Sequence, residues 1–385
     1  MAGYIHLRGA RQGRPPRTIV MLTSSVGTRV PHCERGPASD PARFVPPTAP
    51  VAAAIGHLES AEAYSDFLTA TRGSGLPPVR LEHIERLVRR LEPMPVCNLI
   101  VRSPTGAVIT AVYVDAFLLA DAKWGVAAAA EAVTRVQAAY RMAAQPGVRL
   151  VALGGFSSIV GEFAKLNPAR DHGIAFTTGN ALTAAVIAEQ VLEGLDGAAI
   201  TVTVVGAAGD VGSGLSRILH SRGLRLVLVG RRPGPLEALA ATLPGATVRH
   251  WDDAAPESDV VVLVSSASHG SVPLEGVPAR ALVLDAGHPP NAAAPSARGP
   301  RYAQAGRVRL HHPLESDLPE FIDCYSRGQL HACLAEGMAL ALEGRFESYS
   351  SGRGGITPER AADILALAAR HGIEPAPLRF QRADG

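Results

Sequence analysis

The chain has 385 residues, which is enough for two or three domains that share a sizeable core. With 47% hydrophobic and 19% charged residues and a net charge of +2, the composition is that of a globular protein and does not point to nucleic acid as a partner. No apolar run reaches the roughly 18 residues of a membrane-spanning helix, so no membrane span is expected. The four cysteines fit no zinc spacing, so we expect no metal and, as free thiols, a cytoplasmic location.

The first stretch, residues 1–50, is rich in Pro, Arg and Gly without sustained periodicity, and we predict a poorly ordered extension. From Ala52 onwards the pattern is globular. Two strands, at 97–101 and 108–114, are joined by a Pro-Thr-Gly turn, and an alanine-rich helix follows at 126–144. We therefore predict a mixed α/β domain over 51–149, which we assign to the substrate.

A second group of local signals covers 150–195. The Gly154-Gly155 pair and Ser157-Ser158 predict a loop after a short strand. Residues 177–180 (TTGN) then predict the cap of a helix. The apolar positions of this helix recur at helical spacing, namely Ala184, Ile187, Ala188, Val191 and Leu195.

The most informative stretch is ITVTVVGAAGDVG at 200–212, in which a β-branched strand runs into three glycines and then an amphipathic helix. Such a turn lets a pyrophosphate approach the backbone at the positive end of the helix. A glycine triplet alone also fits a plain tight turn, but the strand and the helix around it favour a dinucleotide site. The candidate cofactor residues here are Gly206, Ala208, Gly209, Asp210, Val211 and Gly212.

A second strand at 226–229 ends in Gly230-Arg231-Arg232. A site selective for NAD usually has an acidic residue there, whereas arginine suits the 2′-phosphate of NADPH. The sequence therefore favours NADPH, with Arg231 and Arg232 as further candidate cofactor residues. The alternative interpretation is a solvated pair of surface arginines.

Strands and helices alternate through the rest of this region. A helix is predicted from Pro235. Continuous apolar strands such as VVVLV and ALVLD indicate a parallel sheet buried on both faces, and hence a doubly wound, Rossmann-like domain over 150–315. The predicted strands are 247–250, 259–264, 281–285 and 307–310. Loops leave their carboxyl ends at 265–267, where Ser265 is a candidate cofactor residue, and at 285–288.

The remaining region, 316–385, is predicted to be helical, with one helix over 327–344, a glycine-rich loop at 352–355 and a last helix from Thr357 to Gly372. Cys333 and Glu336 lie three residues apart on one helix face. A thiolate beside a carboxylate favours acyl transfer, with Glu336 moving a proton or orienting a water. A small core cysteine and a surface glutamate are the plainer interpretations.

Three histidines are further candidates. His288 follows a predicted strand and is either a proton donor or a loop residue bonded to the backbone. His311 and His312 follow the last predicted strand and either face the crevice or lie on the surface. A helix terminus or His312 are the two groups that we consider for lowering the pKa of the Cys333 thiol.

Seven short stretches together resemble the long-chain acyl-[acyl-carrier-protein] reductases of cyanobacteria, which form fatty aldehydes. The resemblance covers 52–375. The stretches, in order, are IGHLES (55–60), ALGGFSSIV (152–160), FTTGNALT (176–183), VVGAAGDVGS (204–213), DAGHPPN (285–291), ACLAEGMAL (332–340) and YSSGRGGIT (349–357).

This resemblance implies reduction of an acyl thioester, carried by acyl carrier protein or coenzyme A, to the aldehyde with NADPH. It places the nucleophile on Cys333 and the accompanying carboxylate on Glu336, and an aldehyde-consuming enzyme is an implied partner. The chain departs from the family at Pro290 (usually Lys), His288 (usually aromatic), Ser351 (usually Trp) and Gly354-Gly355 (usually Asn-Gln). These changes bear on the acyl group rather than on the reaction, so a long alkyl chain is not assumed.

Two other functions fit the same residues. One is a different NADP-dependent oxidoreductase, similar to shikimate dehydrogenase or glutamyl-tRNA reductase, acting on a small polar substrate; the TTGN stretch is compatible with it. The other is a non-catalytic protein that binds NADP(H) and a partner, which the intact Cys333 and Glu336 pair disfavours.

Overall fold

The computed structural model describes residues 46–58, 61–62, 64–65, 77, 79–119, 126–163, 173–195, 200–250, 258–266, 272–288, 290–293, 299–318, 328–350 and 354–380. Most of the predicted extension at 1–50, together with Cys33, Ala267, Cys324 and Ser351, lies outside these residues. In the described part of the chain, no helix is both long and apolar enough to cross a bilayer.

The first sheet has six strands in the order β13-β2-β3-β1-β4-β5. Its strands are β1 (Ala52–Leu58), β2 (Met94–Arg102), β3 (Val108–Leu119), β4 (Leu150–Leu153), β5 (Ala175–Thr177) and β13 (Glu315–Ser316). β2 and β3 form the predicted antiparallel hairpin, whereas β3, β1, β4 and β5 run parallel. Apolar side chains alternate between the two faces, so each face is covered by helices.

Helices α3 (Val126–Ala143) and α4 (Phe156–Phe163) cover one face of this sheet, and α10 (Ala332–Leu342) covers the other. Helix α2 (Leu81–Val88) buries Ile84 and Val88. The prediction that Ser157 and Ser158 lie in a loop is wrong, because both belong to the first turn of α4. Only Gly154 and Gly155 form the turn after β4.

The second sheet is entirely parallel, in the order β11-β10-β9-β6-β7-β8. Its strands are β6 (Thr201–Val205), β7 (Arg225–Gly230), β8 (Thr247–His250), β9 (Val260–Leu263), β10 (Leu282–Asp285) and β11 (Arg301–Gln304). Counted from β6, this is the strand order 3-2-1-4-5-6 of dinucleotide-binding sheets. The predicted Rossmann-like fold is therefore confirmed, with α7 (Asp210–Ser221) and α8 (Pro233–Ala240) packed against one face.

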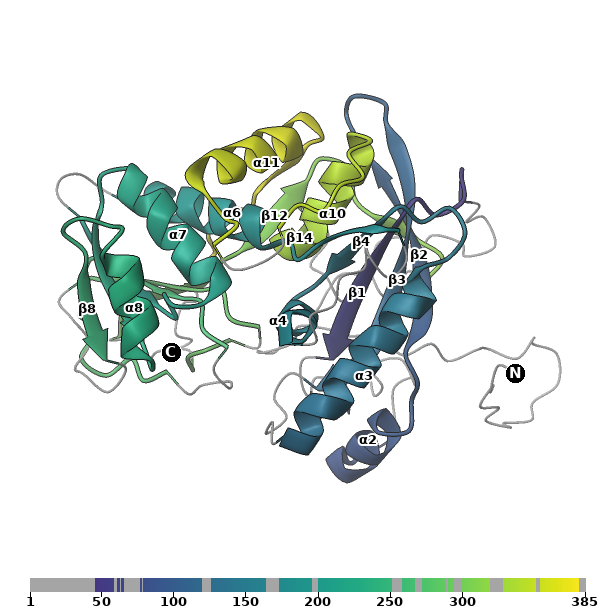
Figure 1. The fold of residues 1–385 in the computed structure, drawn as a ribbon, viewed down its shortest axis with the longest axis horizontal. Helices are drawn as coiled ribbons and strands as arrows, with labels where there is room; N and C mark the ends of the chain where they lie inside the picture. Colours follow the sequence, from purple (N-terminus) through teal and green to yellow (C-terminus); the bar gives the residue numbers. More distant parts are fainter. Residues whose placement is uncertain are drawn as a thin grey trace.

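The sheets do not divide where the sequence analysis divides the chain. β4 pairs with β1 and β5 pairs with β4, so the first sheet extends past residue 150, and β13 returns to it at 315–316. The second sheet begins only at β6, after the predicted helix α6 (Asn180–Glu193). In Figure 1 the second sheet, with α7 and α8, lies on the left, and the first sheet, with α2 and α3, lies on the right; α6, α10 and α11 (Pro358–Arg370) lie between them.

A third, antiparallel sheet has the order β14-β12-β15, formed by β14 (Gln329–His331), β12 (Arg307–Leu310) and β15 (Ile373–Pro375). The prediction that 307–310 belongs to the nucleotide-binding sheet is therefore wrong, and β11 takes that place. The predicted helix over 327–344 begins only at Ala332, because 329–331 pair with β12. Helix α11 begins as predicted, since the Thr357 side chain accepts the Arg360 N–H.

Candidate active site

The glycine turn after β6 is shaped for close backbone approach. Gly206 has φ +94°, and a Cβ there would lie 2.8 Å from the Cα of Ser265. A Cβ on Gly212 would lie 2.9 Å from the Cα of Ala207, so helix and strand meet without a side chain between them. Glycine is required at both positions, and the turn brings Ser265, at the carboxyl end of β9, beside Gly206.

The amino end of α7 fits a phosphate group. Gly209 is the N-cap and makes no side-chain cap, so the first backbone N–H groups of the helix are not covered by a capping side chain. The Asp210 carboxylate accepts a hydrogen bond from Asn180 Nδ2 at 2.7 Å, which ties the amino ends of α6 and α7 together. Ala208 and Val211 are half-buried and complete the turn.

Two further cofactor candidates follow β7, whose carboxyl end neighbours that of β6. Arg231 and Arg232 are exposed there, and Arg232 is the N-cap of α8. On the other side of β6, the N–H and hydroxyl of Ser265 both donate to Asn291 Oδ1 at 3.0 Å. The predicted cofactor residues therefore lie along one edge of the second sheet, as residues that hold a dinucleotide must.

Cys333 is the second residue of α10, at the amino end of the helix. The helix starts there because His331 still belongs to β14 and serves as N-cap. Gly179, the N-cap of α6, lies so close that a Cβ on it would come within 2.5 Å of the Cys333 carbonyl carbon. Cys333, which is half-buried, is therefore held through its backbone by α10 and by the amino end of α6.

Opposing effects act on the Cys333 thiol. Burial raises its pKa, whereas the backbone N–H groups of Gly155 and Leu334 lie against the sulfur and lower it. The charge of Glu336 raises it further. The net pKa is raised, so the N–H groups offset part of the cost of forming the thiolate. A helix terminus, the first activating group considered in the sequence analysis, is thus present at the sulfur.

Glu336 is fully buried and joins α10 to α6. Its carboxylate accepts hydrogen bonds from the Thr177 hydroxyl, from the Leu182 N–H at 2.7 Å and from the Ser350 hydroxyl at 2.7 Å. Burial raises the pKa of the carboxyl, and these three donors oppose that rise. Leu182 lies in the first turn of α6, so Glu336 acts as a cap for that helix from a distance of 154 residues in sequence.

Three imidazoles gather between the turn after β4 and the start of α10. The ring centroids of His57 and His288 are 5.5 Å apart, and those of His288 and His331 are 4.7 Å apart. They come from β1, from the loop after β10 and from β14. Burial is the largest cause of a lowered pKa in all three, so they are neutral at pH 7. The sequence analysis identified only His288. The available signals for the other two were the GHL stretch at 56–58, which contains His57, and the position of His331 two residues before Cys333.

His311 and His312 lie elsewhere. Their rings contact each other at 4.7 Å, and the His311 N–H donates to the Gly372 carbonyl at 2.8 Å. In the β12–β14 pair, Arg307 is opposite His331, so the Cys333 site is at the other end of β12. The four residues of β12 from Arg307 to Leu310 span about 10 Å, and His312 lies two residues beyond them. The prediction that His312 activates the thiol is therefore wrong.

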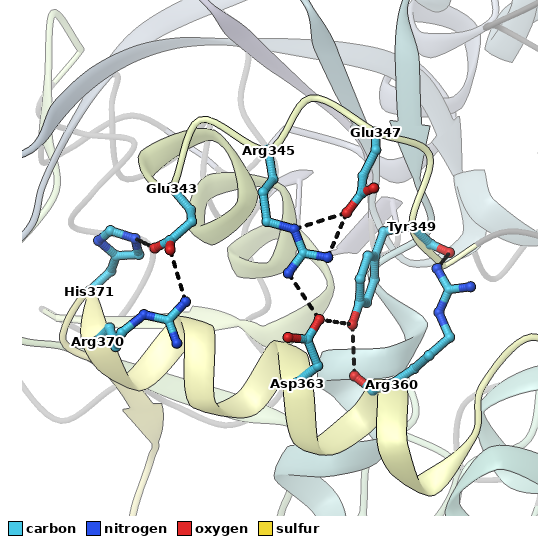
Figure 2. Close-up of polar contacts among 8 residues, drawn as sticks. All are labelled: Glu343, Arg345, Glu347, Tyr349, Arg360, Asp363, Arg370 and His371. Atoms are coloured by element: carbon cyan, nitrogen blue, oxygen red, sulfur yellow. Dashed lines mark hydrogen bonds and ion pairs between the residues drawn. The ribbon is translucent and has the colours of Figure 1, made fainter.

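A polar network behind the site fastens the segment after α10 to α11 (Figure 2). Arg345 bonds Asp363 at 2.9 Å and Glu347, and the Tyr349 hydroxyl donates to Asp363 at 2.9 Å. Glu343 bonds Arg370 and His371, and Arg360 donates to the Tyr349 carbonyl. The next residue, Ser350, is one of the three donors to Glu336, so this network holds that donor in place.

No family model matches the chain. The long-chain acyl-[acyl-carrier-protein] reductase of Synechococcus elongatus is 33% identical over 341 residues, which is 84% of this chain and 98% of that protein. Aminotransferase PigE of Serratia is 28% identical over 308 residues, which is 76% of this chain but only 35% of that protein.

Solved structures that align with the chain include L-tryptophan dehydrogenase from Nostoc punctiforme, with 13% identity, 83% of this chain, 88% of that chain and a TM-score of 0.30. Acetophenone reductase from Geotrichum candidum, solved in complex with NAD, aligns with 17% identity, 43% of this chain, 45% of that chain and a TM-score of 0.27.

The parallel sheet, its glycine turn and the match to a reductase over nearly the whole of that protein define an NAD(P)-dependent oxidoreductase. Within that class, the chain belongs to the long-chain acyl-[acyl-carrier-protein] reductase family.

Proposed function

We propose that the protein reduces an acyl thioester to the aldehyde with NADPH, through an acyl-enzyme on Cys333. The observation that carries the proposal is the position of Cys333 at the amino end of α10, where the N–H groups of Gly155 and Leu334 lie against its sulfur. Backbone N–H groups at a helix terminus stabilise a thiolate, which is the nucleophilic form. Membership of the reductase family supports the same reaction.

In this proposal the Cys333 thiolate attacks the thioester carbonyl, and the carrier leaves as its thiol after taking up a proton. Bound NADPH would supply the hydride that converts the acyl group to the aldehyde, whose departure returns the thiolate of Cys333. The glycine turn, Ser265, Arg231 and Arg232 are the residues that would hold the cofactor. The first sheet would form the acyl site and the second sheet the NADPH site.

Glu336 enters the proposal first as a positioning residue. Its two oxygens already accept three hydrogen bonds, and these fix α10 against the first turn of α6. The direct proton transfer that the sequence analysis attributes to Glu336 stays a prediction.

The carrier is acyl carrier protein or coenzyme A. The Synechococcus relative is named for long-chain acyl-[acyl-carrier-protein], and we extend the thioester, rather than the chain length, to this protein. Three neutral imidazoles near the start of α10 favour an acyl group with polar character near the carbonyl. An aldehyde is reactive, so we propose an aldehyde-consuming partner in the cytoplasm; the Serratia relative is named for aminotransfer, one reaction of that class.

Intact-protein mass tests the acyl-enzyme. The protein is mixed with a panel of acyl-CoA and acyl-carrier thioesters without cofactor. We expect an acyl adduct in the wild type and in Cys97→Ala, which removes a buried thiol from β2. We expect no adduct in Cys333→Ala, which should still bind NADPH. Addition of NADPH should discharge the adduct as aldehyde.

Turnover that persists in Cys333→Ala would overturn the proposal. No adduct from any thioester, with NADPH binding intact, would instead favour hydride transfer to a small polar substrate, as in shikimate-dehydrogenase-like enzymes. Failure to oxidise NADPH with either kind of substrate would favour a non-catalytic binding protein.

Cofactor choice is tested at Arg231. Replacing Arg231 by glutamate is expected to lower kcat/KM for NADPH by about tenfold or more, because the carboxylate repels the 2′-phosphate. The ratio of kcat/KM for NADH to that for NADPH should rise. The control is Arg280→Glu, which makes the same charge change on an exposed residue at the amino end of β10, the opposite edge of the sheet. If the ratio of kcat/KM for NADH to that for NADPH were equal in the two variants, Arg231 would not be the residue that holds the 2′-phosphate.

A further inference from the structure

The turn between β4 and α4 supplies one of the N–H groups at the Cys333 sulfur. Gly155, in the middle of this turn, has φ +51°, a conformation that favours glycine. Its N–H lowers the pKa of the Cys333 thiol, and the turn packs against the start of α10, because a Cβ on Gly154 would lie 2.7 Å from Leu334 Cδ2. Gly154 also donates to the Ile55 carbonyl at 2.8 Å. The turn is therefore a functional part of the thiol site, and what holds the turn also sets the position of that N–H.

His57, at the end of β1, holds the turn with both ring nitrogens in use. Nδ1 lies 3.1 Å from the Leu58 carbonyl, and Nε2 accepts the Phe156 N–H at 2.9 Å. A carbonyl partner requires a proton on Nδ1, and an N–H partner requires a lone pair on Nε2, so these contacts assign a neutral imidazole of one tautomer. The ring is 4% exposed, and a Cβ on Gly155 would overlap Nε2.

We propose that His57 is a positioning residue of the Cys333 centre, which fixes the turn after β4 so that the Gly155 N–H stays against the Cys333 sulfur. His57 reaches the sulfur only through the turn and takes no part in bond making. The inference rests on the proposed role of Cys333 as nucleophile, and it names the residue that keeps one of the thiolate-stabilising groups in place.

An apolar side chain at position 57 cannot hold the turn after β4 in this position. It leaves the part-buried Phe156 N–H without its acceptor, so the turn must move to find another partner. A protonated imidazole fails for a different reason, because Nε2 would then point a hydrogen at the Phe156 N–H. Burial lowers the pKa of His57, and its neighbours His288 and His331 are also held neutral by burial, so the accepting form persists at neutral pH.

The test is the reactivity of the thiol itself, so it does not depend on any thioester. Full-length protein is alkylated with iodoacetamide over a pH series, and modification of the Cys333 peptide is followed by mass spectrometry. In His57→Leu, we expect alkylation at pH 8 to slow by roughly tenfold and the midpoint of the pH profile to move up by about one unit. In His57→Gln, whose amide oxygen can accept the Phe156 N–H, we expect most of the wild-type profile to return.

Two controls accompany the series. His220→Gln removes a surface histidine whose Nε2 bonds the Pro244 carbonyl at 3.1 Å, and it should leave the profile unchanged. Cys97 is an internal standard, because burial raises the pKa of its thiol to about 12 and native protein should protect it in every variant. Faster alkylation of Cys97 would reveal general unfolding.

An unchanged Cys333 profile in a folded His57→Leu protein overturns the inference, whatever the outcome of the thioester experiment. Should His57→Leu fail to fold, the alkylation profile of Gly155→Ala replaces it. The added Cβ would overlap His57 Nε2 and so displace the turn from the imidazole. An unchanged profile there, or a His57→Gln profile as poor as that of His57→Leu, equally overturns it. If the profile shifts in His57→Leu while the wild-type protein forms no acyl adduct, the positioning role stands and the proposed reaction is rejected.

Discussion

Replacing Gly179 by alanine is expected to lower the free energy of unfolding by at least about 3 kcal/mol more than replacing Gly344 by alanine. The added Cβ of Gly179→Ala would lie 2.5 Å from the Cys333 carbonyl carbon, and a backbone atom cannot swing aside. The amino ends of α6 and α10 must then separate. The same movement displaces Cys333 and the Leu182 N–H bonded to Glu336, so acyl-enzyme formation should be lost as well.

Gly344 is the matched control for this substitution. It has φ +72° against +71° at Gly179, and a Cβ there would meet nothing within 4 Å. Gly344→Ala therefore carries only the backbone cost of a left-handed residue, about 1 kcal/mol. Urea unfolding of both variants, followed by circular dichroism and with the acyl adduct measured by mass, separates the contact from the backbone cost. Equal destabilisation would show that the two helix ends do not touch at Gly179.

Replacing Asp115 by asparagine is expected to remove a loss of stability that the wild type suffers between about pH 4 and pH 7. The Asp115 carboxyl is fully buried in β3; Oδ1 accepts the Phe117 N–H at 2.6 Å, while Oδ2 has no hydrogen-bond partner among the described residues. Burial is the main cause that raises its pKa from 3.8 to about 7. Phe117 has φ +48°, so the backbone beside this carboxyl is also strained.

The sign of the effect follows from proton binding. Between pH 3.8 and about 7 the folded protein binds a proton at Asp115 that the unfolded chain has released, so the free energy of unfolding falls as the pH rises through this window. The full difference is on the order of 4 kcal/mol. Asparagine keeps an oxygen for the Phe117 N–H and carries no charge, so Asp115→Asn should be more stable than the wild type at pH 8 and similar to it near pH 4.

Urea unfolding midpoints at pH 4, 6 and 8 measure this difference. The control is Asp259→Asn, because Asp259 is exposed and also accepts a backbone N–H, that of Thr201 at 3.0 Å. That variant should keep the pH dependence of the wild type. A pH dependence in Asp115→Asn equal to that of the wild type would show that the buried carboxyl is ionised at neutral pH and has a partner.

The geometry of the glycine turn and of the sheet edge around it was predictable because its signals are local. The strand, glycine turn and helix that run from Thr201 to Ser221 occupy consecutive residues, and Gly212 is needed by its contact with Ala207 inside that stretch. Gly206 is needed for its positive φ and for its contact with Ser265. Ser265 was found by a rule that is nearly as local, since the carboxyl ends of parallel strands meet at one edge. The hairpin of β2 and β3 was readable for the same reason, from alternation on either side of a turn.

The thiol site was predictable only in part. Cys333 and Glu336 were identified from helical spacing and from family resemblance, yet the start of their helix was misplaced. Residues 329–331 pair with β12, some twenty residues earlier in the chain, and this pairing ends the strand where α10 begins. Helical periodicity in the sequence cannot detect a strand partner at that distance, so the position of Cys333 at a helix terminus was not apparent.

The sequence by itself determined the class of the protein, the cofactor turn and the identity of the candidate nucleophile, because each depends on residues close together in the chain. Only the tertiary structure decided what surrounds the sulfur: His57, His288 and His331 approach each other from three different elements, and Glu336 caps a helix that begins 156 residues before it. It also decided that β4 and β5 complete the first sheet. Pairing between strands that are distant in the chain depends on packing of the whole chain and leaves no mark in a local pattern.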